Sequence, residues 1–303
     1  MRDAFRDPLE STQNDPTEDA AVTAGPAVWS EFPPLVDPVS LPARVLVLAP
    51  HPDDEVLGCG GMLAFHAERG DKVRVVICSG SGTDREEEAA RAARALGLSA
   101  PEVLSFADGG LADEDGLTPR IAQELALHQP ELVYAPSPLE HHPDHRAVLR
   151  ALVDATEGLE LRCLLYGVNQ PAPRGVLFDI TRWREKKRAA LEAHASQVTA
   201  TGLVEKAEAL GRAATINVDD PSVLACEAFS DVSARELASF SRRADQLAPL
   251  GVLLHARPRD VGALPGIARQ TVHVQVRANP NPHPNPNPNP HPNPHPIPNP
   301  IPN

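Results

Sequence analysis

The stretch "LVLAPHPDDEVLGCGG", residues 46–61, joins an apolar run directly to a group of ionisable side chains. With the two residues before it, the run reads "RVLVLA" (44–49), which predicts a strand that is buried on both faces of a sheet. His51, Asp53 and Asp54 follow that strand at once. Acidic residues are usually found in solvent-facing turns, so this position suggests either a polar turn or a metal site.

Strands and helices alternate along the sequence around this stretch. The expected strands are 44–49, 72–79, 102–106, 131–135, 161–168 and 176–180. The expected helices are 60–70, 84–97, 118–128, 144–155, 181–196 and 202–212. Strands that alternate with helices of about 10 to 15 residues indicate βαβ units. The predicted fold class is therefore α/β, a Rossmann-like, mostly parallel sheet with helices on both faces.

Composition divides the 303 residues into four parts. Residues 1–40 are rich in Pro, Asp and Thr and predict a loose N-terminal arm. The α/β domain is expected over 41–230, and 231–277 form an extension that is partly helical. Residues 278–303 are an Asn/Pro/His tail with proline at alternate positions, which excludes a helix and favours an extended low-complexity segment.

Charge and hydropathy exclude several classes of function. The formal net charge is -13, which disfavours nucleic acid and anionic membrane surfaces as partners. No stretch is long enough to predict a membrane span. The four cysteines are isolated, with no C-x-x-C pair, so a cysteine-bound zinc is not expected. Because residues 1–30 hold scattered charge and no apolar run, a cytoplasmic location is expected.

A second His/Asp-rich segment, "EHHPDHRAV" (140–148), follows the strand expected at 131–135. Ligands of open parallel sheets bind at the carboxyl ends of the strands, so the two polar loops can converge on one spot. A catalytic zinc takes three His, Asp or Glu ligands and leaves a position for water. His51 and Asp54 can supply two of these ligands and a histidine of the second loop the third, which leaves Asp53 beside the metal as a proton acceptor.

A dinucleotide site is the rival interpretation of a glycine-containing turn after a first strand. The glycines of "GCGG" (58–61) do not fit the G-x-G-x-x-G pattern, and they follow the acidic turn and not the strand itself. Carboxylates at that position would repel a pyrophosphate. We therefore reject this interpretation.

The two motifs, "APHPDDEVLGCGG" and "HPDH" (142–145), resemble the PIG-L/LmbE-like family of zinc-dependent N-acetylglucosaminyl deacetylases. The resemblance extends over about 45–230. It includes Arg85-x-x-Glu88, "FADGGL" (106–111), "KKRAALEAHASQ" (186–197) and "CEAF" (226–229). It implies an enzyme that hydrolyses the N-acetyl group of an N-acetylglucosamine-containing small molecule.

The resemblance also implies a role for each matching residue. Zn²⁺ would be held by His51, Asp54 and His145. Asp53 would act as the general base, while His142 would stabilise the tetrahedral intermediate and protonate the leaving amine. Asp144 would orient His142 by hydrogen bonding, and two further residues would contact sugar hydroxyls: Arg85 and Asp108.

Several positions keep a second interpretation. Arg85 can belong to a solvated charged helix face instead of the substrate site. His194 can pack near the site or contact it directly, whereas His66 and His128 are expected to be structural or surface residues. The sequence departs from the family at Glu140, where the best-studied members have tyrosine, and at "SGSGTD" (79–84); both departures concern the identity of the substrate.

Two alternatives to the deacetylase follow from the same residues. One is an amidase that cuts a larger sugar-amide conjugate. The other is a catalytically idle sugar-binding protein. Asp53 and His142 oppose the second, because binding alone requires neither a base nor an acid.

Overall fold

The computed structural model describes residues 33–169, 171–172 and 175–242. The chain divides into two compact units, Met1–Asp245 and Gln246–Asn303, and the described residues all belong to the first. The predicted tail (278–303) and most of the predicted extension (231–277) lie outside the described residues, so the domain boundaries stay a prediction.

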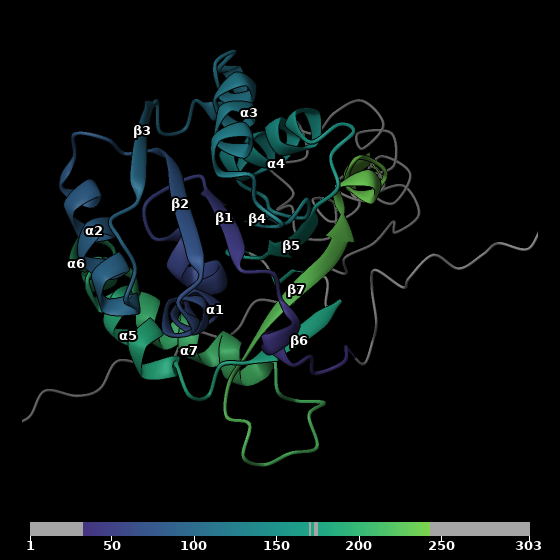
Figure 1. The fold of residues 1–303 in the computed structure, drawn as a ribbon. Coiled ribbons are helices and arrows are strands. Elements are labelled where there is room, and N and C mark those ends of the chain that lie inside the picture. The colour runs from purple at the N-terminus through teal and green to yellow at the C-terminus, as the bar shows by residue number, and fades with distance from the viewer. Residues whose placement is uncertain (1–32, 170, 173–174, 243–303) are drawn as a thin grey trace, which may run out of the picture. The chain divides into compact units, whose positions relative to one another are not determined.

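Seven strands form one sheet in the order β3-β2-β1-β4-β5-β7-β6 (Figure 1). They are β1 (Arg44–Ala49), β2 (Lys72–Ser79), β3 (Glu102–Phe106), β4 (Leu132–Pro136), β5 (Arg162–Tyr166), β6 (Val176–Asp179) and β7 (Cys226–Ser233). The first five pair in parallel, and β7 runs antiparallel to both of its neighbours. The predicted mostly parallel α/β fold is confirmed.

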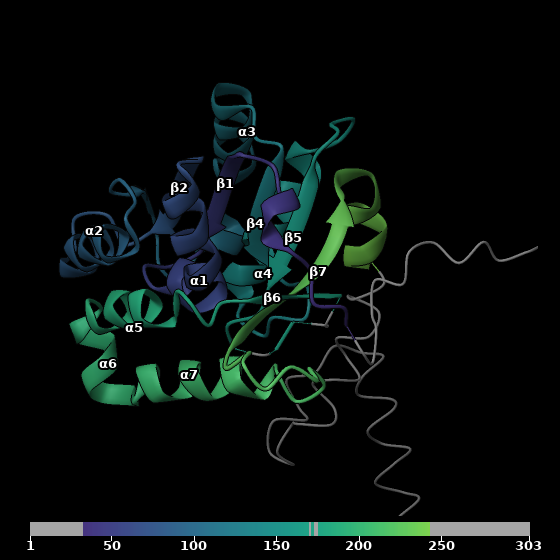
Figure 2. The same cartoon turned by 60° about the horizontal axis from the view of Figure 1, so that its bottom comes forward.

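Helices cover both faces of the sheet (Figures 1 and 2). They are α1 (Asp54–Arg69), α2 (Asp84–Leu96), α3 (Leu117–His128), α4 (Pro143–Ala155), α5 (Arg184–Glu192), α6 (Ala195–Thr201) and α7 (Leu203–Ala213), with 3-10 turns η1 (Pro38–Ser40) and η2 (Leu111–Asp113). Among the described residues, no helix has the length and apolar character needed to cross a bilayer.

Strand β1 shows why its sequence is an unbroken apolar run. Val45 and Val47 belong to the core cluster that includes residues of α1, α2 and α5. Leu46 and Leu48 point the other way, into the cluster that includes residues of α3 and α4. Successive side chains of a strand face opposite sides, so a central strand that is covered on both sides needs apolar residues throughout.

Three elements differ from the predicted ones. The helix expected from residue 60 begins at Asp54, because the polar turn itself forms the first turn of α1. The single helix expected over 181–196 is two helices, α5 and α6, with His194 between them. Strand β7 was not predicted as a strand.

The chain also joins the sheet earlier than predicted. The N–H of Leu177 in β6 donates to the Pro34 carbonyl oxygen (2.9 Å), and the Val36 N–H donates to the Leu177 carbonyl oxygen (2.8 Å). Residues 34–36 therefore pair with the edge strand β6, and the 3-10 turn η1 follows them, so this part of the predicted arm belongs to the domain. Residues 234–242 are helical, in agreement with the prediction for this stretch.

Helix α1 is kinked at Cys59, where the backbone is non-helical (φ -144°, ψ 20°). The kink frees backbone N–H groups, and two of them, from Gly61 and Met62, donate to the Glu227 carboxylate at 2.8 and 2.9 Å. The ammonium of Lys187 donates to the same carboxylate (2.6 Å) and to the Leu57 carbonyl oxygen (2.9 Å). This buried ion pair provides hydrogen-bond partners for the backbone groups around the kink, and the contact of Lys187 with the Leu57 carbonyl oxygen ties it to the first turn of α1.

We expect Lys187→Met to lower the free energy of unfolding by about 3–5 kcal/mol, because it leaves the Glu227 carboxylate buried without its counter-charge. Lys186→Met is the matched control: Lys186 is half-exposed and lies 3.8 Å from Glu68, so a loss of at most about 0.5 kcal/mol is expected. Urea unfolding measures both variants. Adding Glu227→Gln to Lys187→Met should restore part of the loss, and equal small losses at both lysines would contradict the assignment.

Candidate active site

The two polar loops lie side by side at the point where the strand order reverses. Strand β1 pairs with β2 on one side and with β4 on the other. The first loop follows β1 and the second follows β4, so both leave the sheet at its carboxyl edge. Such a switch point is the usual ligand site of an open α/β sheet.

Nitrogen and oxygen atoms from the two loops converge as the sequence predicted. One carboxylate oxygen of Asp54 (Oδ2) lies 3.1 Å from His51 Nδ1 and 3.2 Å from His145 Nε2. The donor atoms of His51, His142 and His145 all lie within 4.8 Å of one another. Asp54 and His145 are buried, and His51 nearly so. Residues that are 94 positions apart in the chain thus form one cluster.

The protonation of this cluster shows that it suits a cation. Burial alone would raise the pKa of Asp54, but the hydrogen bonds from His145 and His51 hold it well below its ordinary value. Burial disfavours the charged form of His145, yet its contacts with Asp54 and Glu140 raise its pKa to about 10. Positive charge is therefore favoured between these rings and the carboxylate. The donor set, two imidazoles and one carboxylate, fits a zinc ion in place of those protons.

Asp53 has a backbone conformation that non-glycine residues seldom adopt. Its φ is 117°, and it immediately precedes α1. The strained conformation is held by Glu55, whose Oε2 accepts the Asp53 N–H at 3.1 Å. Burial, and then the charge of Asp54, raise the pKa of Asp53 to about 7. Backbone strain of this kind is concentrated at functional sites, where it aims a side chain.

The contacts of His142 and Asp144 differ from those that the resemblance implies. The backbone N–H of Asp144, and not its carboxylate, donates to His142 Nδ1 (3.2 Å). The carboxylate instead accepts the N–H groups of Gly109 (2.8 Å) and Leu111 (3.1 Å) and contacts His51 Nε2 (3.0 Å). His142 precedes the first residue of α4, so its ring accepts a helix N-cap hydrogen bond. The orienting role of the Asp144 carboxylate toward His142 stays a prediction.

Arg85 and Asp108 both reach the cluster. Arg85 Nη2 donates to the Pro52 carbonyl oxygen (2.7 Å) and lies 3.5 Å from Asp53 Oδ2. Its Nη1 lies 3.6 Å from Asp108 Oδ2. Asp108 is 59% exposed, and its Oδ1 lies 3.2 Å from His51 Nε2. Arg85 therefore contacts the catalytic turn and does not merely lie on a solvated helix face.

Glu140 has a role that the sequence did not indicate. Its buried carboxylate accepts the N–H groups of Val168 (2.7 Å) and Asn169 (3.2 Å). It also lies 3.1 Å from His145 Nδ1, which makes the two side chains an ion pair when the imidazole is protonated. Glu140 therefore links a predicted metal ligand to the loop after β5. The signal available in the sequence was its position, two residues before "HPDH", in place of tyrosine.

Three buried residues lie next to the turn that contains Asp53 or next to α6: Glu55, His194 and Glu88. His194 is buried and, among the described residues, neither of its ring nitrogens has a hydrogen-bond partner. Its Nε2 lies 3.8 Å from Glu55 Oε1, and Glu55 in turn holds Asp53. Glu88 accepts both the N–H (2.8 Å) and the hydroxyl (2.7 Å) of Ser196. His194 is thus connected to Asp53 indirectly, because it lies next to Glu55 and Glu55 accepts the Asp53 N–H. His66 is buried against Tyr134 and Asp71 and is structural, as expected.

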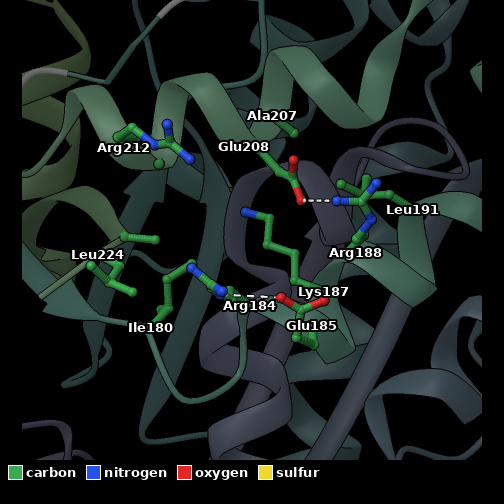
Figure 3. Close-up of a pocket in the computed structure, with 12 residues that line it drawn as sticks. Ile180, Arg184, Glu185, Lys187, Arg188, Leu191, Ala207, Glu208, Arg212 and Leu224 are labelled. Carbon is green, nitrogen blue, oxygen red and sulfur yellow. Dashed lines mark hydrogen bonds and ion pairs between the residues drawn. The ribbon is translucent and has the colours of Figure 1, made fainter.

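The catalytic cluster opens into a cavity of about 480 Å³, within the range of small-molecule pockets, roughly 300–1,000 Å³. A smaller hollow of about 170 Å³ lies between α5 and α7 (Figure 3). Its charged groups are largely paired, Arg184 with Glu185 and Arg188 with Glu208. None of the predicted site residues lines it, so the larger cavity is the candidate active site.

Known proteins resemble this chain over the segment that contains the cluster. A model of the family described as "PIG-L: GlcNAc-PI de-N-acetylase" matches residues 46–156. The 1D-myo-inositol 2-acetamido-2-deoxy-alpha-D-glucopyranoside deacetylase of Mycobacteroides abscessus is 30% identical over 229 residues, which cover 52% of this chain and 82% of that protein. This extent of similarity decides the family.

The chain belongs to the PIG-L family.

Two further relatives bear on its length and fold. The Escherichia coli protein named "Uncharacterized deacetylase YaiS" is 33% identical over 122 residues, 35% of this chain, but only 64% of its own length is matched. The solved structure of N,N'-diacetylchitobiose deacetylase from Pyrococcus horikoshii is 25% identical and has a TM-score of 0.56, covering 67% of this chain and 88% of that one. The match to this chain thus spans less than two thirds of the length of some curated relatives.

The matched PIG-L segment, 46–156, contains every predicted site residue and Glu140. It ends before α5, α7 and β7, the elements that hold the kink of α1 and line the far side of the cavity. The family model therefore covers the predicted ligand cluster but not the pocket wall formed by α7.

We expect Glu140→Gln to weaken zinc affinity about 10- to 100-fold, because a carboxylate beside a ligand imidazole raises the basicity of that ligand. Glu124→Gln is the control: Glu124 is an equally buried carboxylate that pairs with Arg74 (2.9 Å) away from the site. Competition with a chromogenic chelator measures both affinities. Wild-type affinity in Glu140→Gln, or the same loss in both variants, would contradict this role.

Proposed function

We propose that the protein is a zinc-dependent hydrolase that removes the N-acetyl group of an N-acetylglucosamine-containing substrate. The observation that carries the proposal is the position of Asp53, a buried carboxylate with a pKa raised to about 7, next to a set of potential metal ligands in one open cavity. Membership of the PIG-L family supports it, because relatives of this chain are named as deacetylases. A small amino sugar as substrate and a cytoplasmic location are parts of this proposal.

The metal would be held by His51, Asp54 and His145. A bound zinc ion supplies a Lewis acid for the amide carbonyl and lowers the pKa of water from 15.7 to about 7. Asp54 is the only one of the two adjacent aspartates whose carboxylate contacts ring nitrogens of both loops among the described residues. The Asp53 carboxylate would therefore not be a metal ligand.

The remaining steps belong to side chains of this protein. Asp53 accepts the proton of the attacking water, as its raised pKa suits a general base near neutral pH. His142 lines the cavity on the opposite loop and gives a proton to the leaving nitrogen. Arg85 and Asp108, also on the cavity wall, are placed to bind sugar hydroxyls. Arg85 additionally restrains the position of Asp53.

The first test separates two possible ligand sets, because His142 lies as close to His51 and His145 as a ligand would. We expect about one zinc per chain in the purified protein, and its loss in His145→Ala and Asp54→Asn. His142→Ala should keep the metal. Metal content by mass spectrometry, on a chain ending at Ala278 to remove the tail histidines, gives the answer. Zinc lost from His142→Ala and kept by Asp54→Asn would reverse the assignment.

The second test separates the base from the acid. Asp53→Asn keeps the size of the side chain but removes the proton acceptor, so zinc should stay while kcat falls about 10²- to 10⁴-fold. His142→Ala should also slow turnover and keep zinc. In wild type the rate should fall at low pH, as Asp53 is protonated, and at high pH, where the acid that protonates the leaving amine is lost. Since bound cations lower the pKa of a neighbouring carboxylate, the acidic limb should lie below pH 7.

The pH–rate profile of each variant distinguishes the two roles. In His142→Ala the basic limb should flatten or shift while the acidic limb persists. Wild-type turnover of N-acetylglucosaminides by both variants would contradict the acid–base assignment. A wild-type protein that binds such sugars but releases no amine would be the idle sugar-binding protein.

A further inference from the structure

Helix α7 presents an aliphatic stripe to the active-site cavity. Leu203, Lys206, Ala207 and Leu210 all line that cavity, and their spacing places them on one face of the helix. The only buried side chain described in α7 is Val204. Ala207 is partly buried and packs against the core, whereas Lys206 and Leu210 are exposed, so the described residues leave the outer part of the stripe uncovered.

Two residues from other elements extend the stripe. Leu57 lies on α1, one turn after the ligand Asp54, and Val168 lies on the loop that Glu140 holds. Both are only partly buried. Leu210 is 38% exposed, which is unusual for a leucine in a cavity wall. The described residues thus leave an aliphatic surface uncovered inside the pocket that contains the catalytic side chains.

We infer that the amino-sugar substrate carries an apolar aglycone, an aliphatic or aromatic group that binds on this α7 face. The inference rests on the proposed deacetylase function and specifies its substrate class. The residues that would determine aglycone specificity are Leu57, Val168, Leu203, Ala207 and Leu210.

The position of the stripe assigns it to the aglycone and not to the acyl group. The scissile carbonyl has to reach the buried end of the cavity, where Asp54 and His145 are almost inaccessible to solvent. The α7 stripe lies toward the exposed mouth, where Leu210 and Lys206 are accessible. A group far from the scissile amide is therefore the one that meets the stripe.

Lys206 is compatible with an apolar partner. Among the described residues, no carboxylate pairs with its ammonium, so no ion pair holds the side chain away from the cavity that it lines. A lysine stem can cover apolar surface while its charge stays in water. The hollow between α5 and α7 contains none of the predicted catalytic residues, as Figure 3 shows for its labelled lining residues.

The experiment uses the zinc-loaded full chain and N-acetylglucosamine glycosides with methyl, butyl and hexyl aglycones, in both anomers, with amine release as the readout. Burial of each added methylene should raise kcat/KM by about two- to fourfold until the stripe is covered. Leu210→Ser and Leu203→Ser should lower the ratio of the hexyl to the methyl value. Leu127→Ser is the control, because Leu127 is 72% exposed on α3 and does not line the cavity.

The ratio distinguishes recognition from a structural effect. A hexyl-to-methyl ratio of kcat/KM near one in wild type would overturn the inference. So would variants at Leu210 and Leu203 in which kcat/KM for both glycosides falls by the same factor. A parallel series with longer N-acyl groups on the methyl glycoside should not gain from the added length. Rates that rise with acyl length instead of aglycone length would also overturn it.

Equilibrium binding of the same glycosides separates this inference from the proposed function. Amine release without any dependence on aglycone length leaves the deacetylase intact and rejects the apolar subsite. Tighter binding of the hexyl glycoside that is lost in Leu210→Ser, without amine release from any glycoside, keeps the subsite and rejects the deacetylase.

Discussion

Two adjacent carboxylates, Asp53 and Asp54, are both buried at the end of β1, and the rest of the site depends on how their charges are balanced. A buried carboxylate is unstable unless it is paired or protonated. The structure gives the two side chains different solutions. Asp54 lies between two imidazoles and stays charged, whereas for Asp53 burial and the Asp54 charge outweigh the Arg85 guanidinium at 3.5 Å and its pKa rises to about 7. One turn thus contains a carboxylate that stays charged and one that is readily protonated, which is the difference that the proposed roles of ligand and base require.

This difference requires partners from distant segments. His145 comes from the loop after β4 and Arg85 from the start of α2. Glu55 fixes the strained backbone of Asp53, and the Lys187–Glu227 pair fixes the kink of the helix that begins with Asp54. Two of the segments that resemble the family, "KKRAALEAHASQ" and "CEAF", contain Lys187 and Glu227, so the ion pair gives both segments a structural role. Their residues position the catalytic turn through the backbone of α1.

The sequence predicted the parts of this arrangement that depend on local pattern. Apolar runs followed by His/Asp loops indicated the strands and the edge at which the loops meet. The roles of Glu140 and Glu227 could not be predicted, because they depend on which backbone N–H groups lie nearby after folding. Strand β7 was missed because Glu227 and Asp231 interrupt its apolar pattern; in the fold they pair with Lys187 and Arg162. A charged residue in a strand is informative only once its partner is known.

The two ends of the cavity differ in how closely their side chains are packed into the protein core. The catalytic end rests on a buried ion pair, a kinked helix and the central strands, so displacing one of its side chains would disturb the core. The opposite wall is α7, whose cavity-facing side chains leave aliphatic surface uncovered. Substitutions on that face can change which substrate is held without moving Asp53 or Asp54. Such a division would let the proposed deacetylase site serve different aglycones, because the proposed chemistry lies on rigid elements and the inferred recognition surface on a helix with little of its surface buried.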